Sequence, residues 1–121
     1  MNYIQKQRNK ERLLDWISPI SKNKQGFLNV CINNSPEHEL TKYLIFSKLK
    51  RNGFLVWSEV LFNNNSKKAD IVAIKEGTGW IIEVLHTETD EDFNSKIDSY
   101  PMDFDLISVK TKDFNIERFD I

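Results

Sequence analysis

The sequence predicts an α/β fold of the α+β kind, with a mixed central sheet of about four strands flanked by helices. Local patterns follow one another in the order helix, strand, helix, three strands, helix, strand. The 121 residues contain no repeat, low-complexity tract or linker, and this length suits one domain with a modest core. We therefore expect a single domain, in which residues 1–34 form a helix and strand extension packed on a core of residues 35–121.

Three elements precede the expected core. Residues 3–20 have the pattern of an amphipathic helix that ends near Pro19, and residues 21–26 are typical of a turn. Residues 27–32, FLNVCI, have the composition of a strand. The chain has one cysteine, which excludes an internal disulfide and a cysteine-based zinc cage.

The second helix has the clearest start in the sequence. Ser35 can cap it, Pro36 suits its first position, and Asn52 and Gly53 end it. The apolar residues expected on its inner face are Leu40, Tyr43, Leu44 and Leu49.

The second half of the chain is rich in strand patterns. The expected elements are a strand at 54–62, a polar turn at 63–68, a hairpin of 69–75 and 80–86 around residues 76–79, a helix at 89–101 and a strand at 104–110.

The net charge of −1 hides an uneven distribution. Residues 1–51 carry ten Lys and Arg against four Asp and Glu, whereas residues 52–121 carry seven against fourteen. Such halves suit a site that attracts polyanions and holds cations, although two solvated faces of opposite sign give the same counts. No apolar run approaches the roughly 20 residues of a membrane helix, and the N-terminus lacks the apolar segment of a signal peptide. We expect an intracellular, cytoplasmic protein without a membrane partner.

Two carboxylates stand inside the apolar hairpin strands, where an unpaired acid is costly. Asp70 follows KKA, and Glu83 interrupts WIIEVLH. If Lys75 pairs with Trp80, the two acids are diagonal neighbours; a register shifted by two places them directly opposite each other, and a shift by one separates them. Two such carboxylates and a third acid suit Mg²⁺ or Mn²⁺. The candidates for the third acid are Glu59 and Glu39.

The order PEHE on a helix, SEV on a strand, KADIV and then IIEV resembles the PD-(D/E)XK, or restriction-endonuclease-like, nuclease superfamily over about residues 35–110. The segments SPEHELTK, KADI and EVLHTE further resemble its small competence-protein-like branch. The resemblance implies a restriction-endonuclease-like core and a magnesium site in which Asp70 is the metal-binding Asp and Glu83 the second acid. It also implies a catalytic glutamate on the helix, for which Glu39 matches best and Glu37 next.

One position departs from that superfamily, because the lysine of its motif falls at Leu85. A leucine cannot bind water or stabilise a developing oxyanion. Lys96, on the next helix, is the expected replacement; weak activity from metal alone and a degenerate nuclease that binds without cutting are the alternatives.

The sequence therefore predicts a Mg²⁺-dependent DNA nuclease, or a nuclease-like DNA-processing protein. The alternative is a catalytically degenerate nuclease fold that acts as a nucleic-acid- or protein-binding module. One subunit of this size offers little surface to duplex DNA, which is compatible with a homodimer.

Other interpretations of the acidic residues stay open. Asp70 is also typical of a residue that caps the preceding turn, and Lys67 or Lys68 is a possible structural partner for Glu83. Glu59 suits a surface position as well as a metal site. His38 and His86 are weak evidence for zinc at their separation.

Overall fold

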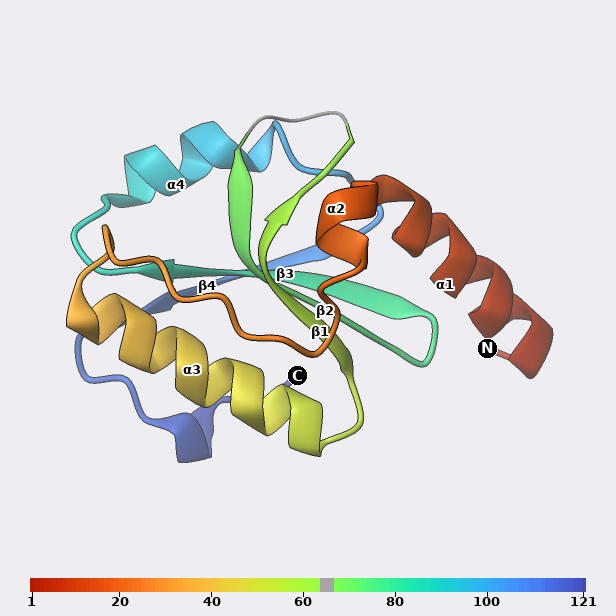
Figure 1. The fold of residues 1–121 in the computed structure, drawn as a ribbon, viewed down its shortest axis with the longest axis horizontal. Coiled ribbons are helices and arrows are strands. Elements are labelled where there is room, and N and C mark those ends of the chain that lie inside the picture. Colours follow the sequence, from red (N-terminus) through yellow and green to blue (C-terminus); the bar gives the residue numbers. More distant parts are fainter. Residues whose placement is uncertain (64–66) are drawn as a thin grey trace.

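The computed structural model describes residues 1–63 and 67–121, which form a four-stranded mixed sheet flanked by helices (Figure 1). The α-helices are α1 (Tyr3–Trp16), α2 (Pro19–Lys22), α3 (Pro36–Arg51) and α4 (Asp90–Ile97), and a 3₁₀ turn η1 spans Ile116–Arg118. The strands are β1 (Leu55–Leu61), β2 (Lys68–Lys75), β3 (Thr78–Leu85) and β4 (Asp105–Lys110). The predicted mixed sheet with flanking helices is confirmed. Part of the predicted turn at 63–68, residues 64–66, lies outside the described residues.

The sheet has the spatial order β1-β2-β3-β4. The first three strands are antiparallel, and α4 carries the chain from β3 across to β4, which runs parallel to β3 (Figure 1). Both faces are covered. Leu13 of α1 belongs to the core on one face, and Ile45, Phe46 and Leu49 of α3 belong to the core on the other. Burial on both faces explains why β2 and β3 are nearly continuous apolar runs.

The helix α3 has the predicted bounds and cap, but a different face points inward. Ser35 accepts a hydrogen bond from the His38 N–H at 3.1 Å, which satisfies one free donor of the first turn. The expected inner residues Leu40 and Tyr43 are 59 % and 50 % exposed. The buried residues are His38, Thr41, Lys42, Ile45, Phe46 and Leu49. The helix is rotated about its axis relative to the predicted orientation. The reason is that His38 and Lys42 pair with the acids Asp70 and Glu59 on the sheet.

Residues 27–32 do not form the predicted strand. This segment passes beside the edge strand β1 and above α3 (Figure 1). It is attached to them by hydrogen bonds that involve side chains, and not by a ladder of backbone hydrogen bonds. The Asn29 N–H donates to Ser58 Oγ at 2.7 Å, and Lys42 Nζ donates to the Asn29 carbonyl at 2.8 Å. The adjacent β1 is continuous, but Glu59 has a φ of +52°, so the backbone of this edge departs from the extended conformation at that residue.

The hairpin between β2 and β3 is tighter than the expected four-residue loop. Its turn is Glu76 and Gly77, whose φ values of +54° and +76° are those of a type I′ turn. Lys75 therefore pairs with Thr78 and not with Trp80. The register is the one shifted by two, and its continuation from the pair Ile71–Ile82 sets Asp70 directly across from Glu83.

The two remaining helical predictions need small corrections. The first helix ends at Trp16, and Pro19 does not stop it but begins the separate helix α2, which Ser18 caps. The helix predicted at 89–101 spans Asp90–Ile97, with Thr89 as its cap. Within the described part of the chain, no helix has the length and apolar character required to cross a membrane.

Candidate active site

Three of the predicted site residues occupy one row across the sheet. The pairs Ser58–Ile71 and Val60–Ala69 flank Glu59 and Asp70, so these two acids stand across from each other on β1 and β2. The same register logic sets Asp70 across from Glu83 on β3. The strand pairing thus gathers acids that are 24 positions apart in sequence, Glu59 and Glu83, around Asp70.

Glu83 is a buried acid, with 1 % of its surface exposed. The Tyr100 hydroxyl donates a hydrogen bond to Oε1, and the Asp70 N–H lies 3.4 Å from Oε2. Burial, followed by the negative charge of Asp70, raises the pKa of Glu83 to about 9. Glu83 is consequently protonated at neutral pH when no cation offsets the charge of its neighbour.

Asp70 keeps its charge beside the protonated Glu83. Its Oδ2 accepts a hydrogen bond from the Val84 N–H at 2.8 Å and lies 3.3 Å from His38 Nε2. Burial acts to raise the pKa of Asp70, but hydrogen bonds with His38 and Glu83 and the charge of His38 hold it below its ordinary value. The pKa values of the two adjacent carboxyl groups therefore differ, so Glu83 can carry a proton while Asp70 is an anion.

His38 connects this carboxyl pair to the start of α3. Its Nδ1 lies 3.4 Å from Glu39 Oε1, so the imidazole sits between two carboxylates. Burial acts to lower the pKa of His38, but the hydrogen bond and charge of Asp70, together with Glu39, raise it above the ordinary value. The two acids therefore stabilise the charged form of the imidazole relative to an exposed histidine.

Lys42 occupies the centre of a second ionic group. Its side chain is fully buried, and Nζ lies 3.0 Å from Glu59 Oε1 and 2.7 Å from Glu39 Oε2. The Glu39 contact is an ion pair, and Oε2 of Glu39 is a buried oxygen without a hydrogen-bond partner among the described residues. Burial acts to lower the pKa of Lys42, but its close contacts with the Glu39 and Glu59 carboxylates, and their negative charges, raise it. The left-handed backbone at Glu59 brings its carboxylate to this lysine, a strained conformation that persists because the ion pair holds it.

Leu85 and Lys96 differ in burial and in their surroundings. Leu85, at the lysine position of the superfamily motif, is buried with 4 % of its surface exposed. Lys96 of α4 is half-buried, and its charge acts on Glu83 as the smallest of five influences, lowering the pKa of that acid. The Lys96 carbonyl accepts a hydrogen bond from Ser99 Oγ at 2.6 Å, but the Lys96 ammonium group makes no hydrogen bond or ion pair within the residues described.

The structure separates the two candidate helical glutamates. Glu39 contacts His38 and Lys42, whereas Glu37 has a 63 % exposed side chain and lies 3.8 Å from His86 Nε2. His86 also contacts Thr111 and takes no part in the carboxyl pair. Glu39 is therefore the glutamate of α3 that belongs to the site.

Sequence reasoning missed three residues of the site: His38 as a bridge, Lys42 as a buried cation and Tyr100 as a donor to Glu83. A signal for the first two was present. His38 and Lys42 precede Ile45, Phe46 and Leu49 at helical spacing, which places them on one continuous stripe of α3.

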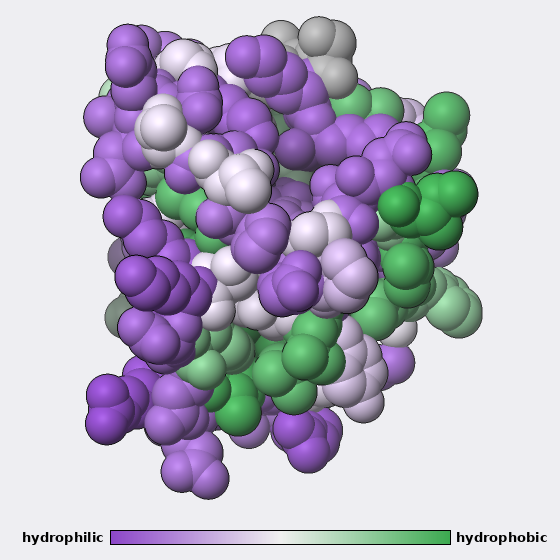
Figure 2. Space-filling model, turned by 90° about the vertical axis from the view of Figure 1, so that its left-hand side faces the viewer, coloured by the Kyte–Doolittle hydropathy of each residue, from purple (hydrophilic) through white to green (hydrophobic). Residues whose placement is uncertain are grey.

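The surface beside the site is acidic. Figure 2 faces the side of the molecule where α4 and the start of α3 lie, and this side is mainly hydrophilic. The first turn of α4 exposes Asp90, Glu91 and Asp92, of which Asp90 lies 3.4 Å from Lys110 Nζ. The acids of this turn attract cations.

The carboxyl groups of Asp70 and Glu83 are suited to Mg²⁺, although they do not form a complete metal site by themselves. No group of three or more His, Cys, Asp and Glu side chains is arranged to hold a metal ion in the ranges 1–63 and 67–121. Mg²⁺, however, is commonly held by one or two carboxylates together with water and substrate phosphates. Asp70 and Glu83 provide such a pair, and their mutual repulsion is what a divalent cation relieves.

Comparison of the chain with protein-family models, with curated proteins and with solved structures finds no match.

Proposed function

We propose that the protein is a Mg²⁺- or Mn²⁺-dependent DNA nuclease, or a nuclease-like DNA-processing protein, that acts inside the cell. One observation carries the proposal: Asp70 and Glu83 face each other on adjacent strands, each accepting a hydrogen bond from the backbone of the other's strand, beside the buried side chains of His38 and Tyr100. Two buried carboxyl groups in contact lower the stability of the fold, because one of them must give up its charge at neutral pH. Such a pair is therefore better explained by a function than by a contribution to stability.

The residues that would hold the metal are Asp70 and Glu83. When bound, a divalent cation would supply Lewis-acid polarisation of a phosphodiester oxygen. Tyr100 fixes the rotamer of Glu83, and His38 fixes that of Asp70 while holding a proton between Asp70 and Glu39.

The other predicted site residues have supporting roles in this proposal. Lys96 is the helper cation for the developing charge, since it already acts on Glu83 from α4. Glu39 orients His38 as the helical glutamate of the site. Glu59 is less suited to bind metal than the sequence predicts, because its carboxylate is neutralised by Lys42.

The second candidate is a catalytically degenerate nuclease fold that binds nucleic acid or protein. The burial of Leu85 and the complete burial of Lys42 favour it, because neither position presents a cation to a substrate. A homodimer is compatible with either function, since it would enlarge the surface available to DNA.

The first prediction tests the chemistry. Supercoiled, linear, branched and single-stranded DNA are incubated with the protein in Mg²⁺, in Mn²⁺ and in chelator. We expect metal-dependent cleavage that Asp70→Asn and Glu83→Gln each reduce by about a hundredfold or more, because each removes one of only two metal-binding carboxylates. Lys96→Ala is expected to slow cleavage, whereas Lys112→Ala, which removes an exposed lysine elsewhere, leaves it unchanged.

Two outcomes contradict the nuclease proposal. Cleavage that persists in chelator or in Asp70→Asn does not come from this site. DNA binding without cleavage of any form in either metal establishes the second candidate.

A further inference from the structure

A separate pocket lies where α1 meets the turn between β2 and β3. It encloses about 370 Å³, and its lining includes Tyr3, Lys6, Lys10, Leu55, Lys75 and Glu76. This volume lies in the range of small-molecule sites. The helix sits directly on the turn, because a Cβ at Gly77 would lie 2.9 Å from the Lys6 Cα. The pocket is therefore a product of close α1 packing and not of a loose surface loop.

The pocket has an excess of positive charge. Lys6 forms an ion pair with Glu76, so these two charges offset each other. Lys75 is held at the rim, since its Nζ donates to the Asn52 carbonyl at 2.6 Å and lies 5.1 Å from the centroid of the Phe54 ring. Lys10 has no hydrogen-bond or ion-pair partner in the described parts of the chain. Lys10 consequently presents a charge without an acidic partner, which suits an anion, and Lys75 adds positive charge from the other side of the pocket.

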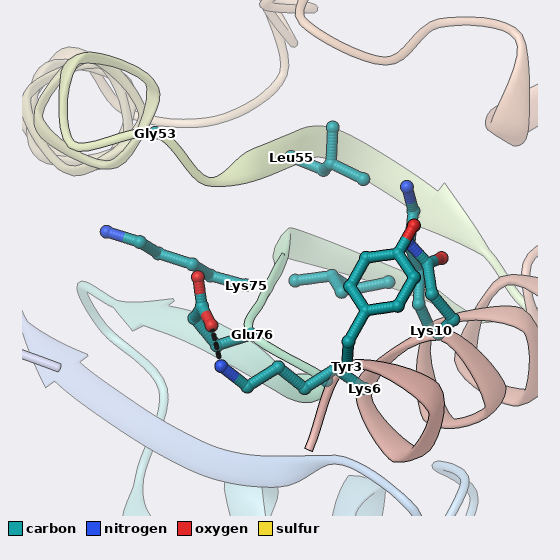
Figure 3. A pocket seen from close by; sticks show the side chains of 10 residues that line it. Tyr3, Lys6, Lys10, Gly53, Leu55, Lys75 and Glu76 are labelled. Atoms are coloured by element: carbon teal, nitrogen blue, oxygen red, sulfur yellow. Dashed lines mark hydrogen bonds and ion pairs between the residues drawn. The ribbon is translucent and has the colours of Figure 1, made fainter. Parts of the chain in front are cut away.

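An aromatic ring stands beside these cations. Tyr3 is 74 % exposed, and its hydroxyl accepts a hydrogen bond from Gln7 Nε2 at 3.1 Å, which restrains the ring. Figure 3 shows Lys75 and Glu76 on one side of the pocket and Tyr3 and Lys10 on the other, with Leu55 between them along the upper wall. An exposed ring with an adjacent apolar wall is suited to stack on a nucleobase.

We propose that this pocket binds a nucleotide, with the phosphate against Lys10 and the base against Tyr3, which lie on the same side of the pocket (Figure 3). The nucleotide is either free or the phosphorylated end of a nucleic-acid chain, which share this chemistry. The pocket is distinct from the carboxyl pair, because Thr78 at the turn is five residues along β3 from Glu83, or roughly 17 Å. The proposal does not depend on cleavage of DNA.

Binding is measured by calorimetry with the full chain carrying Asp70→Asn, in chelator, so that hydrolysis does not interfere. The probes are inorganic phosphate, deoxyadenosine, dAMP, and a tetranucleotide with a 5′-phosphate or a 5′-hydroxyl. We expect dAMP to bind more tightly than phosphate or deoxyadenosine. Lys10→Gln should weaken dAMP binding by about tenfold, because it removes a charge-assisted contact without breaking one in the fold.

Two further variants separate the parts of the site. Tyr3→Ala should abolish the advantage of dAMP over phosphate and leave phosphate binding unchanged, whereas Lys112→Gln, a matched loss of one exposed charge, should change neither. A 5′-phosphorylated tetranucleotide that binds better than dAMP identifies a chain end as the ligand, and the reverse identifies a free nucleotide. Equal dAMP affinity in Lys10→Gln and its parent, or no saturable binding of any probe, overturns the proposal.

Discussion

At the scale of single residues, the central question is which carboxyl holds the proton. Glu83 and Asp70 are neighbours on adjacent strands, yet burial and the charge of Asp70 raise the pKa of Glu83 while His38 helps to hold the pKa of Asp70 down. The difference follows from the partners, since Asp70 meets an imidazole and Glu83 meets a tyrosine hydroxyl. The hydrogen bond from Tyr100 lowers the pKa of Glu83 but is outweighed by burial and the charge of Asp70, whereas His38 favours the charged form of Asp70.

The raised pKa of Glu83 predicts a pH-dependent stability. In the unfolded chain this acid loses its proton near pH 4.5, but in the folded chain only near pH 9, so the folded state binds more protons between these values. The free energy of unfolding must therefore fall as pH rises from about 5 to about 9. The raised pKa of His38 acts in the same direction above pH 6.5.

We expect Glu83→Gln to remove most of that fall, which is about 1.4 kcal/mol for each pH unit in this range, since glutamine keeps the acceptor for Tyr100 but cannot titrate. Urea denaturation at three pH values measures it. Glu91→Gln on the exposed first turn of α4 is the control and should have the slope of the wild type. An unchanged slope in Glu83→Gln would show that this acid is already ionised in the folded protein.

Lys42 is predicted to stabilise the fold through its two carboxylate partners. Lys42→Met leaves Glu39 and Glu59 close together without a cation and should lower the free energy of unfolding by about 3 kcal/mol. Adding Glu39→Gln and Glu59→Gln to Lys42→Met should recover more than half of the loss, because the unpaired charges are then gone. The exposed control Lys112→Met should change stability by less than about 0.5 kcal/mol. No recovery in the triple variant would mean that packing of the lysine stem, and not its charge, is what matters.

At the scale of elements, a two-residue turn decides the composition of the site. Because Glu76 and Gly77 close the hairpin, Asp70 stands opposite Glu83; one residue more or fewer would send the acids to opposite faces. The same turn supports α1, whose Lys6 backbone lies against Gly77. The hairpin turn therefore controls both the carboxyl pair and the proposed nucleotide pocket.

Substitution of Gly77 measures that double role. Gly77→Ala should lower the free energy of unfolding by about 2 kcal/mol or more, since a Cβ there is disfavoured by the φ of +76° and also clashes with Lys6. Gly53→Ala is the matched control, because Gly53 has a φ of +86° but only the end of the Lys75 side chain nearby. It should cost about 1 kcal/mol. Equal losses, compared by urea denaturation, would show that the contact of α1 with the turn carries no energy.

At the scale of the whole molecule, acidic groups gather at one end. The buried carboxyl pair, Glu39 at the start of α3 and the exposed first turn of α4 all contribute there. The basic residues of α1 lie on a different element, so the acidic and the basic side chains are found on different parts of the surface. A cation bound at the acidic end would stabilise the folded chain by mass action.

Thermal unfolding tests this coupling. Millimolar Mn²⁺ should raise the Tm of the wild type by about 3 °C or more and leave the variant with Asp70→Asn and Glu83→Gln unchanged. The shift should grow between about pH 6.5 and pH 8.5, because the cation has to displace the proton of Glu83. Identical melting curves in metal and in chelator at both pH values would exclude a cation site at this pair.

Much of the fold follows from local sequence. The cap at Ser35, the strand patterns of 54–62 and 104–110, and the apolar hairpin strands determine where most elements lie, because caps, turns and apolar runs act over a few residues. The acids at 70 and 83 could be identified for the same reason, since each breaks an apolar run.

Only the tertiary structure determined which faces of these elements are buried and which residues they contact. The face of α3 that points inward was misassigned, because the ion pairs of Lys42 with Glu59 on β1 outweigh the burial of Leu40 and Tyr43. The strand expected at 27–32 is absent, since its neighbour Ser58 offers a side-chain acceptor and the backbone of β1 departs from the extended conformation at Glu59. Composition cannot reveal either outcome, because each depends on groups that only long-range contacts bring together.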